Sequence, residues 1–159
     1  MDLDEKTLLQ CCGSKRWARE MVQAGPYQDA ETLIAKAHAI WWALEPQDWL
    51  EAFRSHPKIG EKKAAAPVSD RSRQWSGQEQ AGVSNASRET VDALAALNHA
   101  YEQKFGFIFI ICATGKTSEE MLSALRQRLN NDTATELPVA AAEQSKITEL
   151  RLKKLISCA

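Results

Sequence analysis

The amino-acid sequence predicts an all-α protein, a single compact helical domain of about seven to eight helices that spans residues 1–159. Apolar residues recur at helical spacing along most of the chain, and capping residues or Gly and Pro breaks separate these stretches. Residues 107–113 differ, because they are rich in aromatic and β-branched residues but have no second strand to pair with. We therefore expect a buried extended connector near 107–113.

Four helices are expected in the first third of the chain. They cover residues 4–12, 15–24 and 29–43 and a stretch that begins at Pro46. Ser14 and Asp29 precede the second and third helices, where their side-chain oxygens can accept hydrogen bonds from unpaired backbone amides. Pro46 is tolerated because it falls in a first turn. Each of these boundaries therefore has a local chemical cause.

The middle of the chain is less regular. Residues 55–74 show no clean period and are expected to form a long loop or a set of short turns. Loops of this length in compact domains are usually functional or disordered. Helix is expected to resume at Ser76, because Ser76 to Glu79 fit the capping-box pattern.

Three further helices are expected in the last half of the chain. They cover residues 87–104, 117–130 and 136–156. Thr117 to Glu120 form a second capping box at the start of the middle one. Pro138 is acceptable in the last helix only because it falls in the first turn, where no backbone donor is needed.

The charge balance argues against two classes of partner. Lys plus Arg (20) nearly equal Asp plus Glu (21), so no global field would attract nucleic acid or an anionic membrane. No apolar run reaches the roughly 20 residues that a membrane span needs, and residues 1–6 are too polar for a signal peptide. We expect a cytoplasmic protein that binds neither nucleic acid nor membrane.

The cysteines and histidines do not predict a metal site. Cys11 and Cys12 are adjacent, which suits neither a CxxC redox pair nor a zinc knuckle. The remaining cysteines and the three histidines do not complete a metal-ligand set. Free thiols in a reducing compartment are the simplest interpretation.

His56-Pro57 is the first candidate for chemistry. Proline biases the preceding residue toward extended backbone, so His56 is expected just outside its helix, where it can project into a cleft. The near-neutral intrinsic pKa of histidine suits proton transfer. A solvated or helix-capping histidine would explain the same dipeptide without any function, because most histidines do not catalyse.

Ser76, Glu79 and Gln80 are the second candidate. A helix start presents unpaired amides and the positive end of the helix dipole, which favour anionic or carbonyl groups of a ligand. A nearby carboxylate and carboxamide can then bind ureido N–H and C=O groups. The capping box alone would explain Ser76 and Glu79 as structural residues, so both interpretations stay open.

The extended segment that ends at Ala113 is the third candidate. Its default role is core packing. Its backbone N–H and C=O groups must nevertheless find partners, and a ligand can be one of them. Cys112 within it is more often an inert buried thiol than a nucleophile.

Each of these signals is weak alone, but their order is specific. His56 to Gly60 comes first, Trp75 to Gly82 second, and Asn98 to Ala113, including Phe105-Gly106-Phe107, third. Together they resemble the family of decarboxylases that act on 2-oxo-4-hydroxy-4-carboxy-5-ureidoimidazoline (OHCU) in urate breakdown. The resemblance covers nearly the whole chain.

The resemblance implies an all-α enzyme without a cofactor, often a homodimer, that converts OHCU to (S)-allantoin. An association with the hydrolase that precedes it in the pathway is also expected. On the matching positions, His56 becomes the catalytic acid/base and Pro57 a pocket wall. The implied substrate-binding residues, with Glu79 and Gln80 as the chief polar contacts, are Ser76, Gly77, Gln78, Glu79, Gln80, Phe109, Ile110, Ile111, Cys112 and Ala113.

The residue types fit this chemistry. Loss of CO2 leaves electron density on a ring carbon, and the adjacent imidazoline C=N can accept it, so no pyridoxal or thiamin is required. The protein must orient the carboxylate, stabilise charge and protonate one face. We expect His56 to contact the hydroxyl and carboxylate region and to help deliver the proton. Glu79 either keeps His56 protonated or holds the ureido nitrogens.

One departure from the family pattern concerns the carboxylate. Several animal members carry an arginine at the position of Thr114, so Lys116 or the helix start near Ser118 is expected to replace it. Two alternatives remain. One is a non-catalytic helical binding module, and the other is a different ureido- or imidazoline-handling lyase on the same scaffold.

Overall fold

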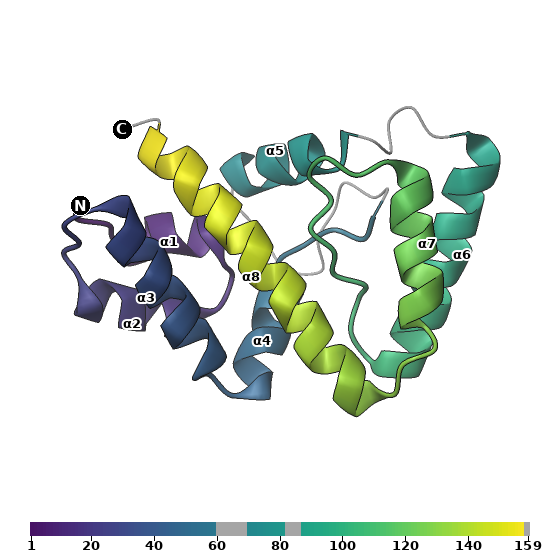
Figure 1. The fold of residues 1–159 in the computed structure, drawn as a ribbon, viewed down its shortest axis with the longest axis horizontal. Coiled ribbons are helices and arrows are strands. Elements are labelled where there is room, and N and C mark those ends of the chain that lie inside the picture. Colours follow the sequence, from purple (N-terminus) through teal and green to yellow (C-terminus); the bar gives the residue numbers. More distant parts are fainter. Residues whose placement is uncertain (60–69, 82–86, 158–159) are drawn as a thin grey trace.

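The protein is mainly helical in the part of the chain that this computed structural model describes, residues 1–59, 70–81 and 87–157. Within these ranges there are eight helices and no β-strand, which confirms the predicted fold class (Figure 1). The helices are α1 (Glu5–Cys11), α2 (Lys15–Ala24), α3 (Ala30–Trp42), α4 (Pro46–Phe53), α5 (Asp70–Glu79), α6 (Arg88–Phe105), α7 (Ser118–Arg128) and α8 (Thr133–Ser157).

The long helix α8 lies at the centre of the arrangement. Figure 1 shows it running diagonally between the N-terminal helices α1 to α4 and the pair α6 and α7. It packs against α1, α3, α4 and α6. Its buried residues mix apolar and polar types: Glu136, Ala140, Ala141, Gln144, Ser145, Ile147, Thr148, Arg151 and Leu152. The helix therefore brings several polar side chains into the interior, where each needs a hydrogen-bonding partner.

The capping predictions for the early helices are confirmed. The Ser14 hydroxyl accepts a hydrogen bond from the Trp17 amide at 3.2 Å, and α2 covers the predicted residues 15–24. The Asp29 carboxylate accepts from the Thr32 amide at 2.8 Å at the start of α3. The predicted capping box at Thr117 is also present. These boundaries are set by contacts within one turn, which is why the sequence alone predicts them.

The predicted helix start at Ser76 is wrong. Helix α5 begins at Asp70, so Ser76 and Glu79 lie toward its C-terminal end and do not form a capping box. The predicted loop over residues 55–74 is therefore shorter, and its residues 60–69 lie outside the described part of the chain. Both side chains are instead bound by Arg151 of α8, a partner that is distant in sequence.

The predicted start of the last helix is also wrong. Helix α8 begins at Thr133, and Asp132 accepts a hydrogen bond from the Thr135 amide at 2.8 Å. Pro138 consequently lies inside the helix and not in its first turn. Because proline has no N–H, the carbonyl of Ala134 lacks its usual hydrogen bond within the helix.

The connector (residues 107–113) is extended and mostly buried, as predicted. Its aromatic residues pack into an aromatic cluster rather than into a sheet. The Phe107 ring lies 5.6 Å from Phe53, and the Phe109 ring lies 5.4 Å from Tyr101 in an edge-on arrangement. Packing of this kind replaces the strand pairing that the composition of the segment would otherwise favour.

The turn that leads into the connector requires a glycine. Gly106 ends α6 with φ of 80°, in the left-handed region, and a Cβ there would meet no other atom. We expect Gly106→Ala to lower the free energy of unfolding by about 1 kcal/mol, because a Cβ is unfavourable at this φ. Gly77→Ala is the matched control, since its Cβ is also unobstructed but its backbone is helical. Urea denaturation of both variants tests this, and equal losses of stability would contradict it.

Candidate active site

A pocket opens between the segment after α4, the end of α5, the connector and α8. Its empty space is about 340 Å³ when the open solvent at its mouth is included. Its lining residues are His56, Pro57, Ile59, Ser76, Glu79, Gln80, Phe109, Ile110, Ile111, Ala113 and Ile147. The structure thus brings together most of the residues that the sequence analysis named, from all three blocks.

Three of the expected substrate-binding residues do not line the pocket. Gly77 and Gln78 are exposed on α5, between the buried Ser76 and Glu79. Helical spacing explains this, because residues three apart share a face and the two between them turn away. Cys112 is buried, but its amide donates to Glu143 at 3.0 Å.

His56 lies just after α4 and is almost completely buried. Its amide donates to the carbonyl of Phe53 at 3.1 Å, which folds the chain back at the helix end. Its Nε2 lies 2.6 Å from Oε1 of Gln144, a fully buried residue of α8. The histidine is therefore held between the end of α4 and the buried face of α8.

The surroundings of His56 favour the neutral imidazole. Burial lowers the pKa of His56 to about 3, and the positive charge of Arg151 adds to this effect, while the hydrogen bond with Gln144 opposes it. His56 is therefore uncharged at neutral pH. A neutral imidazole has one nitrogen that can accept a proton and one that can donate.

Glu79 and Arg151 form a buried ion pair beside the pocket. The Arg151 Nε donates to Oε2 of Glu79 at 3.0 Å, and Nη2 donates to Oε1 at 2.9 Å. Nη2 also donates to the Ser76 hydroxyl at 3.1 Å, and Nη1 to the Gln10 carbonyl at 3.3 Å. This bidentate contact orients both polar residues of α5 that line the pocket.

The ion pair bears on the two roles considered for Glu79. Its carboxylate is bound to Arg151, and the pKa of His56 is lowered by burial and by the charge of Arg151. These contacts give no support to the hypothesis that Glu79 keeps His56 protonated. Contact with the ureido nitrogens stays a prediction, since Glu79 still lines the pocket.

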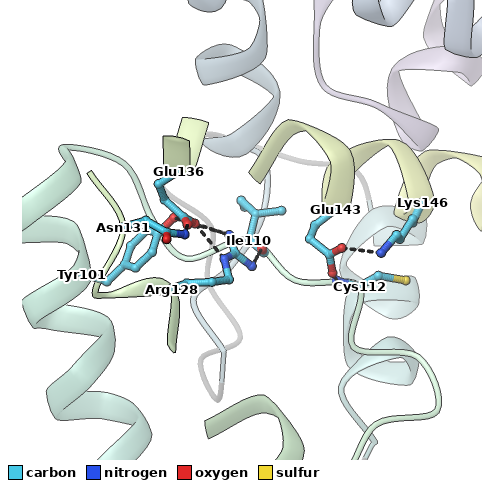
Figure 2. Close-up of polar contacts among 8 residues, drawn as sticks. All are labelled: Tyr101, Ile110, Cys112, Arg128, Asn131, Glu136, Glu143 and Lys146. Atoms are coloured by element: carbon cyan, nitrogen blue, oxygen red, sulfur yellow. Dashed lines mark hydrogen bonds and ion pairs between the residues drawn. The ribbon is translucent and has the colours of Figure 1, made fainter. Parts of the chain in front are cut away.

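Side chains of α7, α8 and the turn that precedes α7 hold the connector's backbone. Besides the Cys112 amide bound by Glu143, the Cys112 carbonyl accepts from Lys116 at 2.8 Å. The Ile110 carbonyl accepts from Arg128 Nη1 at 2.6 Å. Figure 2 shows the contacts of Glu143 and Arg128 on this stretch. These backbone groups are already paired within the protein, so a ligand does not need to satisfy them.

Arg128 is itself fixed by a buried acidic residue. Glu136 is fully buried and accepts hydrogen bonds from Arg128 Nε at 2.7 Å, from Asn131 at 3.0 Å and from the Tyr101 hydroxyl (Figure 2). The Arg128 guanidinium also lies 4.5 Å from the centre of the Phe109 ring. The Arg128 side chain of α7 thus links α6, α8 and the connector.

The expected replacement for the family arginine is not found at the pocket. Thr114 is exposed, Lys116 is bound to the connector, and neither Lys116 nor Ser118 lines the pocket. Arg151 lies directly behind Ser76 and Glu79 and is the cation whose charge acts on His56. The positive charge near the pocket therefore comes from α8 and not from the turn after the connector.

A model of the OHCU decarboxylase family matches residues 3–153. The chain belongs to this family. It is 42% identical over 158 residues to the uric acid degradation bifunctional protein TTL of Arabidopsis thaliana, covering 99% of this chain and 48% of that protein. It is 35% identical over 108 residues to the 2-oxo-4-hydroxy-4-carboxy-5-ureidoimidazoline decarboxylase of Amia calva, covering 66% of this chain and 59% of the other.

The fold agrees with that of a solved OHCU decarboxylase. A crystal structure described as OHCU decarboxylase in the presence of (S)-allantoin superposes with a TM-score of 0.82 at 40% identity. The match covers 96% of this chain and 98% of the other. By contrast, the chain spans only about half the length of the Arabidopsis relative and 31% of the uric acid degradation bifunctional protein PucL of Bacillus subtilis.

Two residues of this OHCU decarboxylase family member were missed by sequence reasoning. Gln144 and Arg151 contact the predicted site residues from α8, a helix that the sequence predicts from its apolar positions alone. The signal that was available is periodicity. Gln144, Ile147 and Arg151 follow one another at spacings of three and four, so two polar residues share a face with an apolar one.

Neither a metal site nor a membrane span is seen in the described residues of this family member. No group of three or more His, Cys, Asp or Glu side chains in ranges 1–59, 70–81 and 87–157 could hold a metal ion. In the same ranges, no helix combines the length and apolar character needed to cross a membrane.

The neutral, buried His56 predicts a specific pH dependence of stability. The unfolded chain binds a proton on His56 near pH 6.5, whereas the folded protein does so only near pH 3. Stability therefore falls as the pH drops through this window, by about 2 kcal/mol between pH 7 and pH 5 from this group. We expect His56→Gln to lack this component when urea denaturation is compared at the two pH values. Parallel losses of stability in both proteins would contradict the assignment.

Proposed function

We propose that this protein decarboxylates OHCU to (S)-allantoin without a cofactor, with His56 as the acid/base and Glu79 and Gln80 orienting the substrate. The observation that carries the proposal is the convergence of three separate sequence blocks on one pocket. His56, the polar face of α5 and the connector line it together, in a chain that belongs to the OHCU decarboxylase family.

The decarboxylation needs no cofactor to accept electrons, because the substrate's own ring can accept the electron pair that CO2 leaves behind. As the carbon–carbon bond to the carboxylate breaks, CO2 leaves and the electron pair moves into the ring. The adjacent C=N accepts the pair, and its nitrogen takes one proton from solvent, which is the one proton that the overall reaction consumes. The resulting enol then loses its hydroxyl proton and gains a proton at the ring carbon that carries the ureido group. This last transfer creates the stereocentre of (S)-allantoin.

His56 suits the proton transfer in the last step. It lines the pocket as a neutral imidazole, so one ring nitrogen can accept the hydroxyl proton of the enol and return a proton to carbon. Delivery from a fixed side chain reaches only one face of the planar enol. The apolar connector, which lines the pocket with Phe109 and Ile111, helps to exclude water.

Polar residues at the end of α5 and directly after it are suited to holding the ureido group. Glu79 offers carboxylate oxygens to ureido N–H groups, and Gln80 offers both a donor and an acceptor. The ion pair with Arg151 fixes Glu79 in one orientation. Arg151 also supplies positive charge next to the pocket, which favours a substrate that carries a carboxylate.

We further propose that residues 1–159 act as one domain, that the protein is a cytoplasmic homodimer, and that it associates with the hydrolase that precedes it in the pathway. The Arabidopsis relative is named a bifunctional uric acid degradation protein, which supports a link between two activities of this breakdown. Size-exclusion chromatography with light scattering tests the dimer directly.

The central test is the conversion of freshly generated OHCU. We expect (S)-allantoin, followed by its optical activity, to form faster than by spontaneous decay. His56→Ala should lower kcat by about 100-fold to 10,000-fold, which is the usual contribution of a general acid or base. Circular dichroism checks that the variant folds, and His56→Asn is a second variant that leaves a smaller cavity.

The outcomes separate this proposal from its alternatives. If the parent protein binds OHCU but does not turn it over, it is a binding module. If it forms a product other than (S)-allantoin, it is a different lyase. If a folded His56→Ala variant is as fast as the parent, the role of His56 is wrong.

Replacing Arg151 tests the orientation of α5. Arg151→Lys keeps a positive charge beside Glu79 but loses the bidentate contact and the bond to Ser76. We expect kcat/KM to fall by about 100-fold, because small displacements of orienting groups are that costly. Arg126→Lys, at an exposed position of α7, is the matched control. Equal kcat/KM values for the two folded variants would contradict the role of Arg151.

A further inference from the structure

His56 has a buried polar neighbour on α8, Gln144. The Nε2 atom of His56 lies 2.6 Å from the Gln144 side-chain oxygen. Gln144 is fully buried in the middle of α8, and His56 is 7% exposed. A contact this short between two buried groups must be a hydrogen bond with a defined donor and acceptor.

The other end of the Gln144 amide shows which way it points. Its nitrogen donates to the Thr148 hydroxyl at 3.0 Å, one helical turn later. A threonine hydroxyl oxygen can accept this bond, whereas the amide nitrogen of glutamine can only donate. The Gln144 carbonyl oxygen therefore faces His56.

We propose that Gln144 is a positioning residue that fixes the tautomer of His56, so that Nε2 carries the proton and Nδ1 is the basic nitrogen. A carbonyl oxygen cannot donate, so the hydrogen in this contact belongs to Nε2 of His56. In a neutral imidazole the remaining nitrogen, Nδ1, then has a free electron pair. The inference rests on the proposed function for its catalytic consequence, but not for the tautomer itself.

The charged groups around His56 support a neutral ring with one proton. Arg151 from α8 lowers the pKa of His56 by its positive charge, after the larger effect of burial. Glu79 from α5 is bound to Arg151. No charge from these two elements therefore drives His56 toward the doubly protonated form.

The tautomer defines the route of the proton in the proposed reaction. Nδ1 accepts the hydroxyl proton of the enol while Nε2–H stays bonded to Gln144. The imidazolium formed for that moment is stabilised by the Gln144 oxygen, and Nδ1 then gives the proton to the ring carbon. The histidine ends the step in its starting form, so no proton is gained or lost by the enzyme.

The tautomer can be observed without any substrate. In protein labelled with ¹⁵N-histidine, we expect the Nε2 resonance of His56 to show the shift of a protonated ring nitrogen and Nδ1 that of an unprotonated one at neutral pH. Comparison with the His56→Gln spectrum assigns the signals. A proton found on Nδ1 would overturn the proposal, even if the protein decarboxylates OHCU.

Two substitutions of Gln144 separate a positioning role from a structural one. Gln144→Met removes the acceptor, and we expect kcat to fall about 10-fold to 100-fold at every pH with little change in KM. Gln144→Glu keeps a hydrogen-bond acceptor but adds a negative charge next to His56. This charge raises the pKa of His56, so that Nδ1 also carries a proton and can no longer act as a base. Its kcat should therefore be low at neutral pH and recover as the pH rises.

Ser145→Ala is the matched control for both variants. Ser145 is the next residue of α8 and is also buried, but its hydroxyl lies 2.6 Å from Nδ1 of His38 and not near His56. Its kcat and pH profile should equal those of the parent. If Gln144→Glu loses activity at all pH values in a folded protein, or shows the parent's pH profile, Gln144 does not set the protonation of His56. Absence of turnover in the parent would instead contradict the proposed function.

Discussion

The buried ion pair between Arg151 and Glu79 is the contact on which the rest of the site depends. It joins α8 to α5, orients two pocket-lining residues and places a positive charge near His56. Two buried charges are costly to desolvate, and removing one partner of such a pair typically costs about 3–5 kcal/mol because the other charge is left unpaired. The pair is therefore tolerated only with complete geometry, which the bidentate contact and the additional bond to Ser76 provide.

Other buried polar side chains of α8 also bind segments that line the pocket. Glu136 and Glu143 act on the connector, Glu143 directly and Glu136 through Arg128. Gln144 holds His56, and Arg151 holds α5. The connector, His56 and α5 are thus all bound to one helix, which also packs against α1, α3, α4 and α6. Fixing separate segments to a common helix is a physical way to pre-organise a site built from distant parts of the chain.

The sequence predicted those features that depend on neighbours within about one helical turn. The caps at Ser14, Asp29 and Thr117 are present because a side chain and an amide three residues away suffice to make them. The connector was predicted from its composition and its lack of a partner strand. The same local logic failed at Ser76, where the capping-box pattern is present but the side chains bind Arg151, 75 residues away.

The sequence by itself determined the all-α class, most helix boundaries and the three blocks whose order identifies the family. It named His56 and most of the residues that line the pocket. Only the tertiary structure decided the burial of His56, the partner of Glu79 and the contacts of Gln144 and Arg151. The physical reason is that burial and charge act through space. A pKa or an ion pair depends on which segments the fold brings together, and nothing in the local pattern around His56 or Glu79 encodes its partner on α8.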